Sequence, residues 1–194
     1  MPRQRRKLYD EASYHIINRG HNKSFIFKEP QDYEQFKSII HNYKKKYCFE
    51  LFHYCIMGNH FHLIIRIKHG HELPLVMKCI TQSYVNYYKR KYHFTGILFQ
   101  NRYKSFPIEK EEYLLECARY VERNPLRAKI VQNIRKYAWS SYKYYAIGFI
   151  DDIIDTNPLY DTFGNREGER HKRYQSYVGQ DRPYENLLDK VIMK

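Results

Sequence analysis

The spacing of hydrophobic positions predicts a chain of alternating strands and helices. Amphipathic helices show apolar residues every three or four positions. This period is found in three segments, residues 32–46, 74–92 and 110–124. Strands favour aromatic and β-branched residues. Such residues dominate three other segments, residues 13–18, 49–56 and 61–67. The Met-Gly-Asn string at 57–59 joins the last two strands, so we expect them to form a hairpin.

The later part of the chain is less regular. Pro125 is expected to stop or kink the third helix near Asn124, because the residue before a proline disfavours the helical region. Residues 96–107 read as a loop or short strand that is dense in rings and cations. Beyond Trp139 the periodicity weakens. We therefore expect a main domain over 1–147 and an extension over 148–194, for which DNA contact is one reading.

Composition narrows the class of protein. The 194 residues are 43% hydrophobic and 28% charged, as in a folded domain, and carry a formal net charge of +13. Such a positive surplus attracts polyanions, and nucleic acid is the commonest of these, although solubility or lipid affinity are other readings. The 21 tyrosines can stack on unpaired bases or simply pack the core. Composition does not choose between these two roles.

Cysteine usage and hydropathy indicate the cytoplasm. The four cysteines form no CxxC pair and lie in apolar runs, which predicts buried, reduced thiols. No apolar run reaches the roughly 18 residues that cross a membrane. The basic residues at 3–7 are expected to form a flexible arm rather than a targeting signal.

The strongest candidate for chemistry is the string His60-Phe61-His62 in the second hairpin strand. Residues two apart share a strand face, so both imidazoles lie together while Phe61 faces the core. Two neighbouring imidazoles can hold a divalent cation and leave coordination positions open. Two surface histidines also arise by chance, so the pattern alone leaves metal binding open. His15, on the first strand, either flanks the same site or is a packed, hydrogen-bonded histidine.

Tyr120 and Asn124 lie four residues apart on the third predicted helix and therefore on one face. The apolar stripe of this helix contains Leu114, Ala118 and Val121, and the two polar side chains lie at its edge. A hydroxyl and an amide at this edge can meet the histidine face of the sheet. The alternative is a border tyrosine whose hydroxyl faces water.

Five strings resemble HUH-type single-tyrosine transposases, and most of all the REP-associated tyrosine transposases of the IS200-like family. The strings occur in the expected order at residues 14–20, 57–63, 96–105, 119–128 and 139–142. The second string resembles the metal motif of these enzymes, in which two histidines flank one hydrophobic residue. The fourth looks like their tyrosine helix. The resemblance covers residues 8–145 and continues faintly to Val178.

The resemblance implies an α+β fold, a ferredoxin-like antiparallel sheet with helices packed on one face and the histidines on the open face. It implies that Tyr120 is the nucleophile of a catalytic domain over 1–147. It also implies that His60 and His62 are metal ligands, with Asn124 as the third. Mg²⁺ or Mn²⁺ is the expected metal, since the thiolates that favour structural zinc are missing. DNA contacts are expected at five residues: Arg19, Arg102, Tyr103, Lys104 and Arg127.

The activity implied is a metal-dependent transesterase that cleaves and rejoins hairpin-containing single-stranded DNA. A phenol is a weak nucleophile at neutral pH, but a metal on the scissile phosphate assists its attack. The product is a 5′-phosphotyrosine with a free 3′-hydroxyl, so no nucleotide cofactor is needed. The expected partner is single-stranded or hairpin DNA. The protein is expected to act as a monomer or homodimer in the bacterial cytoplasm, on the nucleoid when bound to DNA.

Two other functions stay open. One is a domesticated regulator that binds hairpin nucleic acid without cleaving it, although the intact set of tyrosine, histidines and asparagine argues against this. The other is a metal-dependent phosphodiesterase that uses water. A covalent adduct on Tyr120 distinguishes transesterification from this second alternative.

Overall fold

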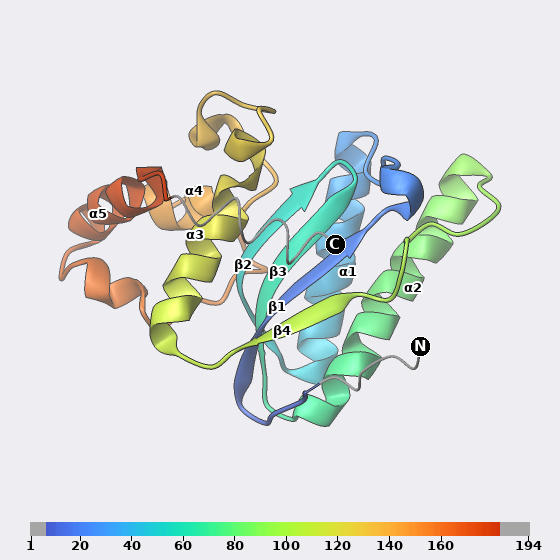
Figure 1. The fold of residues 1–194 in the computed structure, drawn as a ribbon, viewed down its shortest axis with the longest axis horizontal. Helices are drawn as coiled ribbons and strands as arrows, with labels where there is room; N and C mark the ends of the chain where they lie inside the picture. Colours follow the sequence, from blue (N-terminus) through green and yellow to red (C-terminus); the bar gives the residue numbers. More distant parts are fainter. Residues whose placement is uncertain (1–6, 183–194) are drawn as a thin grey trace.

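A four-stranded antiparallel sheet forms the centre of residues 7–182, the part of the chain that the computed structural model describes (Figure 1). The strands are β1 (Ala12–Arg19), β2 (Glu50–Met57), β3 (His60–Ile67) and β4 (Lys104–Ile108). Their spatial order is β2-β3-β1-β4. With α1 (Pro30–Tyr47) and α2 (Leu73–Tyr92), the chain order is β1-α1-β2-β3-α2-β4. This arrangement is ferredoxin-like, so the predicted α+β class is confirmed.

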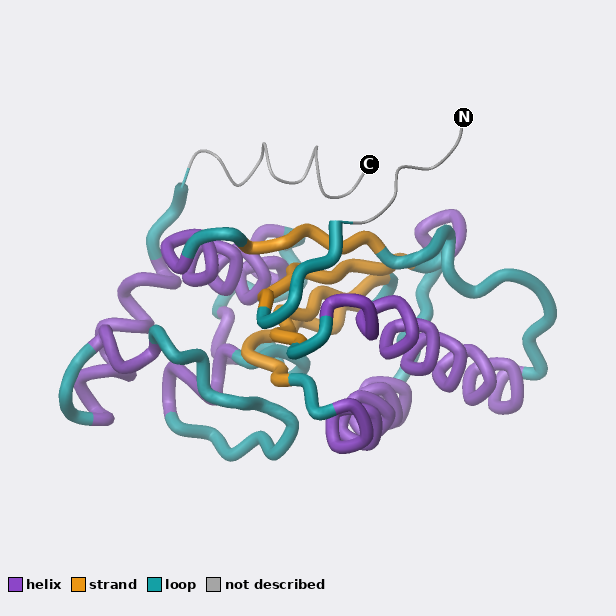
Figure 2. Tube along the Cα trace, turned by 90° about the horizontal axis from the view of Figure 1, so that it is seen from below, coloured by secondary structure: helices purple, strands orange, loops and turns teal. Residues whose placement is uncertain are grey.

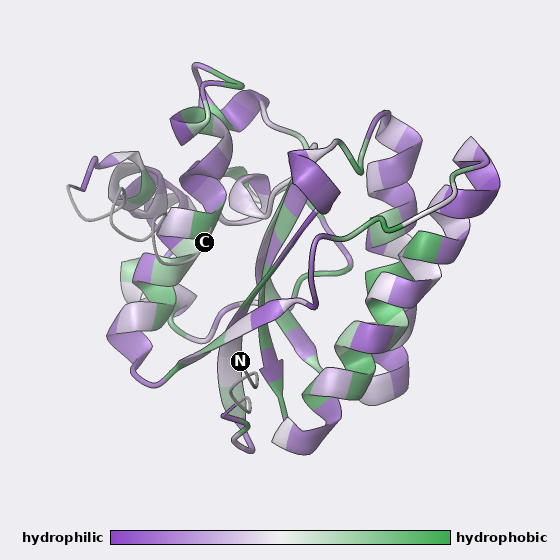
Figure 3. Cartoon of the chain, turned by 45° about the vertical axis from the view of Figure 1, so that its right-hand side comes forward, coloured by the Kyte–Doolittle hydropathy of each residue, from purple (hydrophilic) through white to green (hydrophobic). Residues whose placement is uncertain are grey.

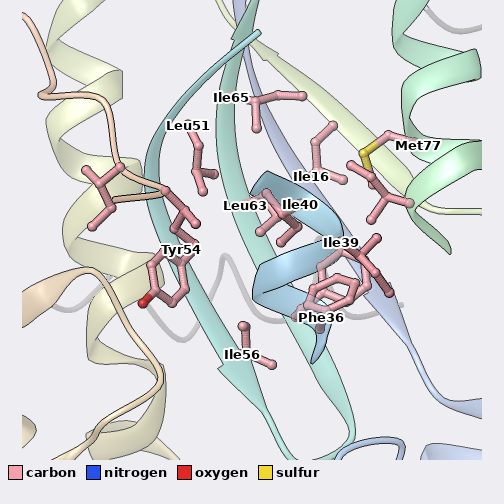
Figure 4. Packing of buried hydrophobic residues seen from close by; sticks show 14 of the residues in the cluster. Ile16, Phe36, Ile39, Ile40, Leu51, Tyr54, Ile56, Leu63, Ile65 and Met77 are labelled. Atoms are coloured by element: carbon pink, nitrogen blue, oxygen red, sulfur yellow. The ribbon is translucent and has the colours of Figure 1, made fainter. Parts of the chain in front are cut away.

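Helices α1 and α2 cover one face of the sheet and enclose the main core. Figure 4 shows this packing, with Phe36 from α1, Met77 from α2 and Leu63 from β3 among its labelled side chains. All three are completely buried. Figure 3 shows hydrophobic and hydrophilic residues alternating along α2, as an amphipathic helix requires. Burial of each large apolar side chain contributes about 1.5–3 kcal/mol, which makes this face the main source of stability.

The register of the sheet determines where the polar residues of the strands lie. Side chains alternate along a strand, and the core residues of β3 face α1 and α2, so His60 and His62 face the other way. β1 pairs Ile17 with His62 and Arg19 with His60. Ile17 also pairs with Lys104 of β4. Three strands therefore place His60, His62, Arg19 and Lys104 on one sheet face.

Helix α3 (Glu111–Arg127) covers part of that second face, and Figure 2 shows the helices in two groups that flank the strands. The buried residues Leu114, Ala118 and Val121 of α3 pack with Ile17 and Ile64 of the sheet. The resemblance to the transposase family implies helices on one face of the sheet and histidines on an open face. α1 and α2 occupy the first face as expected, and α3 encloses part of the other, so the imidazoles are buried.

Helix α3 continues past Pro125 to Arg127, whereas the sequence predicts a stop or kink near Asn124. Pro125 has no N–H to offer the Val121 carbonyl. The Asn124 side chain takes its place, because its Nδ2 donates to the Val121 carbonyl at 3.2 Å and to the Tyr120 carbonyl at 2.9 Å. The helix therefore keeps its last turn.

Two C-terminal helices, α4 (Tyr142–Ile147) and α5 (Glu167–Gly179), pack beside α3 (Figure 1). Tyr145, Tyr160 and Tyr174 are buried there and belong to the same core cluster as α1 and α2. The described part of the expected extension, residues 148–182, thus packs against the domain. Its DNA contact stays a prediction, and residues 1–6 and 183–194 lie outside the described range.

The cysteines and the hydropathy of the helices were the subject of two expectations from composition. All four cysteines are free, but only Cys55 is buried. Cys48 is exposed because it forms the left-handed C-cap of α1, where the chain leaves the helix. No helix in residues 7–182 combines the length and apolar character that a membrane span requires.

Asp32 joins the start of α1 to the end of α2. Its carboxylate is completely buried and accepts hydrogen bonds from Lys91 Nζ, the Tyr87 and Tyr92 hydroxyls and the Lys28 N–H at 2.7–2.8 Å. Burial alone would raise the pKa of Asp32. These donors, Lys91 first among them, instead hold the pKa below its ordinary value.

Asp32→Asn is expected to lower the free energy of unfolding at neutral pH by about 2–3 kcal/mol, because it leaves the Lys91 ammonium without its buried carboxylate. The pKa of Asp32 falls on folding, so this stabilisation is complete above the ordinary value of 3.8 and is lost as the pH falls through the folded pKa. Urea unfolding at about pH 7 and about pH 3 measures the loss. The exposed Glu34→Gln on the same helix is the control, and an equal difference between wild type and Asp32→Asn at both pH values would contradict this explanation.

Candidate functional site

His60 is oriented by its chain neighbour. Its Nδ1 lies 2.6 Å from Asn59 Oδ1. Asn59 Nδ2 donates to the Lys23 carbonyl at 3.1 Å, which turns the amide oxygen toward His60. That oxygen can only accept, so Nδ1 of His60 carries the proton and Nε2 carries the lone pair.

His62 is oriented by His15 of β1. His62 is completely buried, and its Nδ1 lies 2.8 Å from Nε2 of His15. The two rings stack with centroids 5.1 Å apart and an interplanar angle of 19°. Burial lowers the pKa of His15 to about 4. Burial, helped by His15, His60 and Arg127, also places the pKa of His62 well below its ordinary value. Both imidazoles are therefore neutral at neutral pH, which is the form that binds metals.

Helix α3 places Tyr120 against this histidine pair. The Tyr120 ring meets His62 and His15 edge-on, with centroid distances of 5.8 Å and 5.9 Å. Only 1% of Tyr120 is exposed, so it lies between helix and sheet rather than at a water-facing border. The Arg127 guanidinium lies 5.1 Å from the centre of the Tyr120 ring, a cation–π contact at the end of the helix.

The donor set of this site fits a divalent cation. Nε2 of His62 is buried and has no hydrogen-bond partner within residues 7–182, a costly arrangement unless a ligand satisfies it. Asn124 lies one turn after Tyr120 and is 8% exposed. Because its Nδ2 is used by two helix carbonyls, a ligand role falls to Oδ1. No three His, Cys, Asp or Glu side chains of the described chain gather as a metal group. His60 and His62 offer two imidazoles, and the Asn124 amide stays the predicted third ligand.

Cations border the site on three elements. Arg19 of β1 pairs with His60. Ile17 of β1 lies between Lys104 of β4 and His62 of β3 in the sheet. Arg127 of α3 lies over the Tyr120 ring. Burial, and then the charge of Arg19, lower the pKa of Lys104. Positive groups around a buried phenol create the environment that a phosphate group requires.

The remaining two residues predicted to contact DNA, Arg102 and Tyr103, lie outside the group around Tyr120. Arg102 is exposed. Tyr103 is 7% exposed and belongs to the main core, which leaves its ring little surface for an unpaired base. The structure thus brings together seven of the nine residues predicted from sequence and the resemblance, and their roles stay predictions.

A buried carboxylate fixes α3 in place. Glu122 is completely buried and accepts hydrogen bonds from His53 Nδ1 at 3.0 Å, Ser141 Oγ at 2.6 Å and the Tyr174 hydroxyl at 2.8 Å. These donors come from β2, the start of α4 and α5. Asn157 Nδ2 lies 2.9 Å from Nε2 of His53. Since the amide nitrogen donates, the proton of His53 is on Nδ1, facing Glu122.

Two arginines of α3 hold the end of α5. Arg119 donates to the Tyr177 carbonyl at 3.2 Å and Arg123 to the Val178 carbonyl at 2.9 Å. Both arginines are buried, and cations at a helix C-terminus complement its dipole. Because these residues surround Tyr120 in sequence, the position of Tyr120 depends on α5.

Sequence reasoning missed the residues that hold the site. One signal was available for Glu122, which follows Ala118 by four residues and so falls on the apolar stripe of its helix. A carboxylate on a buried stripe needs donors. Its partners, His53, Ser141 and Tyr174, come from segments far apart in the chain, and no local pattern identifies them.

Comparison with known proteins gives the family. Residues 8–124 match the sequence profile described as "Transposase IS200 like". This range runs from β1 into α3 and includes His60, His62, Tyr120 and Asn124. The chain belongs to the IS200-like transposase family, as its five strings indicate. No curated protein matches it.

Solved structures agree with the fold. The structure of a REP-associated tyrosine transposase bound to a REP hairpin is similar, with a TM-score of 0.65 and 15% identity. The alignment covers 81% of this chain and 93% of that chain. A transposase from Deinococcus radiodurans R1, whose name marks the assignment as provisional, gives a TM-score of 0.44 and 18% identity over 63% of this chain and 97% of that chain. The first similarity shows a common fold, and the second is too low to support an argument.

Glu122→Gln is expected to loosen α3 and α5 together, because an amide in place of the carboxylate presents a donor where three donors converge. The free energy of unfolding should fall by about 2 kcal/mol. Hydrogen–deuterium exchange should rise in both 111–127 and 167–179 while 30–47 stays protected. Glu112→Gln, exposed on the same helix, is the matched control. Unchanged exchange in α5 would show that Glu122 does not couple the two helices.

Proposed function

We propose that this chain is a metal-dependent DNA transesterase that cleaves and rejoins hairpin-containing single strands through a 5′-phosphotyrosine on Tyr120. The supporting observation is the position of that phenol. Its ring meets His62 edge-on at 5.8 Å, in a buried site bordered by cations, within a member of the IS200-like transposase family. A tyrosine that served only to pack the core would not need the neutral imidazoles of His15 and His62 beside its ring.

The chain's own residues have distinct roles in this reaction. Arg19, Lys104 and Arg127 attract and orient the scissile phosphate. The Tyr120 oxygen forms a bond to phosphorus as the bond from phosphorus to the 3′-oxygen breaks. The phenol gives up its proton and the departing 3′-oxygen gains one, so the step is balanced. A second 3′-hydroxyl reverses the step and joins strands, and since the phosphodiester energy is kept in the covalent bond, no nucleotide is consumed.

His60, His62 and the Asn124 Oδ1 would hold Mg²⁺ or Mn²⁺. When bound, such a cation supplies Lewis-acid polarisation of the phosphate. The two imidazoles suit this role because neighbouring side chains hold their Nδ1 atoms, and because burial keeps the pKa of His62 well below its ordinary value. The Asn124 amide oxygen is compatible with the oxygen-rich coordination that Mg²⁺ prefers.

Hairpin DNA is the proposed substrate. The net charge of +13 supports a nucleic-acid partner. The structurally similar REP-associated tyrosine transposase is bound to a REP hairpin. Tyr120 lies over the histidines of its own chain, so a monomer contains the whole site and a homodimer is equally compatible. We place this activity in the bacterial cytoplasm, on the nucleoid when DNA is bound.

Tyr120→Phe is expected to keep the fold and the hairpin affinity but to form no covalent product. The substitution removes one oxygen on which the chemistry depends entirely, so the loss appears in turnover and not in binding. Wild type and variant are incubated with a hairpin that carries single-stranded flanks and with Mg²⁺ or Mn²⁺, and protein–DNA species that resist SDS are counted. Tyr137→Phe, which removes a buried hydroxyl bonded to the Ile56 carbonyl, is the control and should react normally.

The same assay distinguishes the alternatives. A phosphodiesterase that uses water would cut the hairpin in both wild type and Tyr120→Phe. A hairpin-binding regulator would bind DNA in both and cut in neither. Cleavage that survives in Tyr120→Phe would refute the covalent mechanism.

A further inference from the structure

We propose that His15 is a positioning residue that holds the His62 ring in the tautomer whose Nε2 lone pair faces the candidate cation site. This inference rests on the proposed metal-dependent function. It concerns the chain's own hydrogen bonding, however, and can be tested without DNA or metal.

The two rings are fixed by neighbouring strands. His15 is on β1 and His62 on β3, where the register pairs His15 with Ile64 and Ile17 with His62. The histidines are therefore diagonal neighbours on the same sheet face. Nε2 of His15 and Nδ1 of His62 are 2.8 Å apart, and 1% and 0% of the two side chains are exposed. Water therefore does not compete for this bond.

One proton lies between these two nitrogens, and its location decides what His62 can bind. If His15 donates, His62 must carry its own proton on Nε2, which then cannot ligate a cation. If His62 donates from Nδ1, its Nε2 keeps the lone pair. That Nε2 is buried and has no hydrogen-bond partner within the described residues. A buried N–H there would lack an acceptor, whereas a lone pair there would be satisfied by a cation.

His60 provides an internal comparison. Its Nδ1 faces Asn59 Oδ1 at 2.6 Å, and that oxygen can only accept. His60 is thereby held with its lone pair on Nε2. His15 has the same relation to Nδ1 of His62 as Asn59 has to Nδ1 of His60. Metal-binding histidines commonly donate their second N–H to such a partner, which orients the ring and raises ligand basicity.

The surroundings of His15 support a positioning role. The Tyr120 ring meets His15 edge-on at 5.9 Å, and the Phe106 ring of β4 lies 6.1 Å away. These contacts limit rotation of the His15 ring and so fix the direction of its Nε2. His15 thereby aligns His62 with respect to Tyr120.

Two variants of His15 separate hydrogen bonding from packing. In His15→Gln the side-chain oxygen can occupy the place of Nε2 and accept the His62 proton. In His15→Leu a side chain of similar bulk fills the space and accepts nothing. Phe106→Leu is the matched control, because it alters packing beside His15 and leaves the bond intact.

The first readout is Mn²⁺ affinity of the full chain without DNA, measured by calorimetry. We expect His15→Leu to weaken binding by about 10–100-fold, whereas His15→Gln and Phe106→Leu stay within about threefold of wild type. Melting temperatures of the three variants show that the comparison concerns folded protein. Equal affinity of His15→Leu and wild type would overturn the proposal, and so would equal losses in Gln and Leu, since these indicate packing alone.

The second readout is the His62 tautomer in the metal-free protein, from ring ¹⁵N chemical shifts. Wild type and His15→Gln should show the proton on Nδ1, and His15→Leu should show a mixture or the Nε2–H form. A proton on Nε2 in the wild type would overturn the proposal. If wild type binds no Mn²⁺, the metal part of the proposed function fails, while the tautomer measurement still decides the role of His15.

Discussion

The buried carboxylate of Glu122 is the interaction on which the position of the tyrosine helix depends. It accepts hydrogen bonds from β2, from the start of α4 and from α5, so three separate parts of the fold meet at one residue of α3. A buried carboxylate is tolerated only when donors satisfy it, which means that α3 cannot shift without exposing an unsatisfied charge. Tyr120 is two residues away. The C-terminal helices, which carry no residue of the site, thereby determine where the phenol lies.

The two faces of the sheet have different contents: one carries the main apolar core and the other carries the candidate site. One face packs against α1 and α2 in an apolar core, as Figure 4 shows. The other gathers imidazoles, cations and a phenol under α3. Because that second face is enclosed, His15 and His62 are neutral at neutral pH and the hydrogen bond between them does not compete with water. The same enclosure strengthens every charge that an incoming phosphate would meet. In the proposed reaction, the scissile strand must therefore reach a tyrosine that is buried between helix and sheet.

Periodic sequence patterns predicted the helices and the strand faces, because both depend only on neighbouring residues. The helix expected over residues 32–46 is α1, Pro30–Tyr47, because amphipathic periodicity reflects the face that is buried. Strand alternation alone placed His60 and His62 together. The stop expected near Asn124 does not occur, because Asn124 supplies the N–H that Pro125 lacks, a compensation between side chain and backbone. The bond from His15 to His62 depends on the β1–β3 register, and the partners of Glu122 depend on how β2, α4 and α5 pack. Neither kind of information is present in a periodic pattern.

In the proposed reaction Tyr120, and no other tyrosine among the 21 of the chain, becomes joined to DNA. Mass spectrometry of peptides from protein that has reacted with a nicked hairpin tests this directly, because a covalent nucleotide adds its mass to the peptide that carries it. The covalent mechanism predicts an adduct on the peptide spanning residues 119–127, localised to the Tyr120 side chain. An adduct on a different tyrosine, or cleaved DNA with no modified peptide, would contradict it.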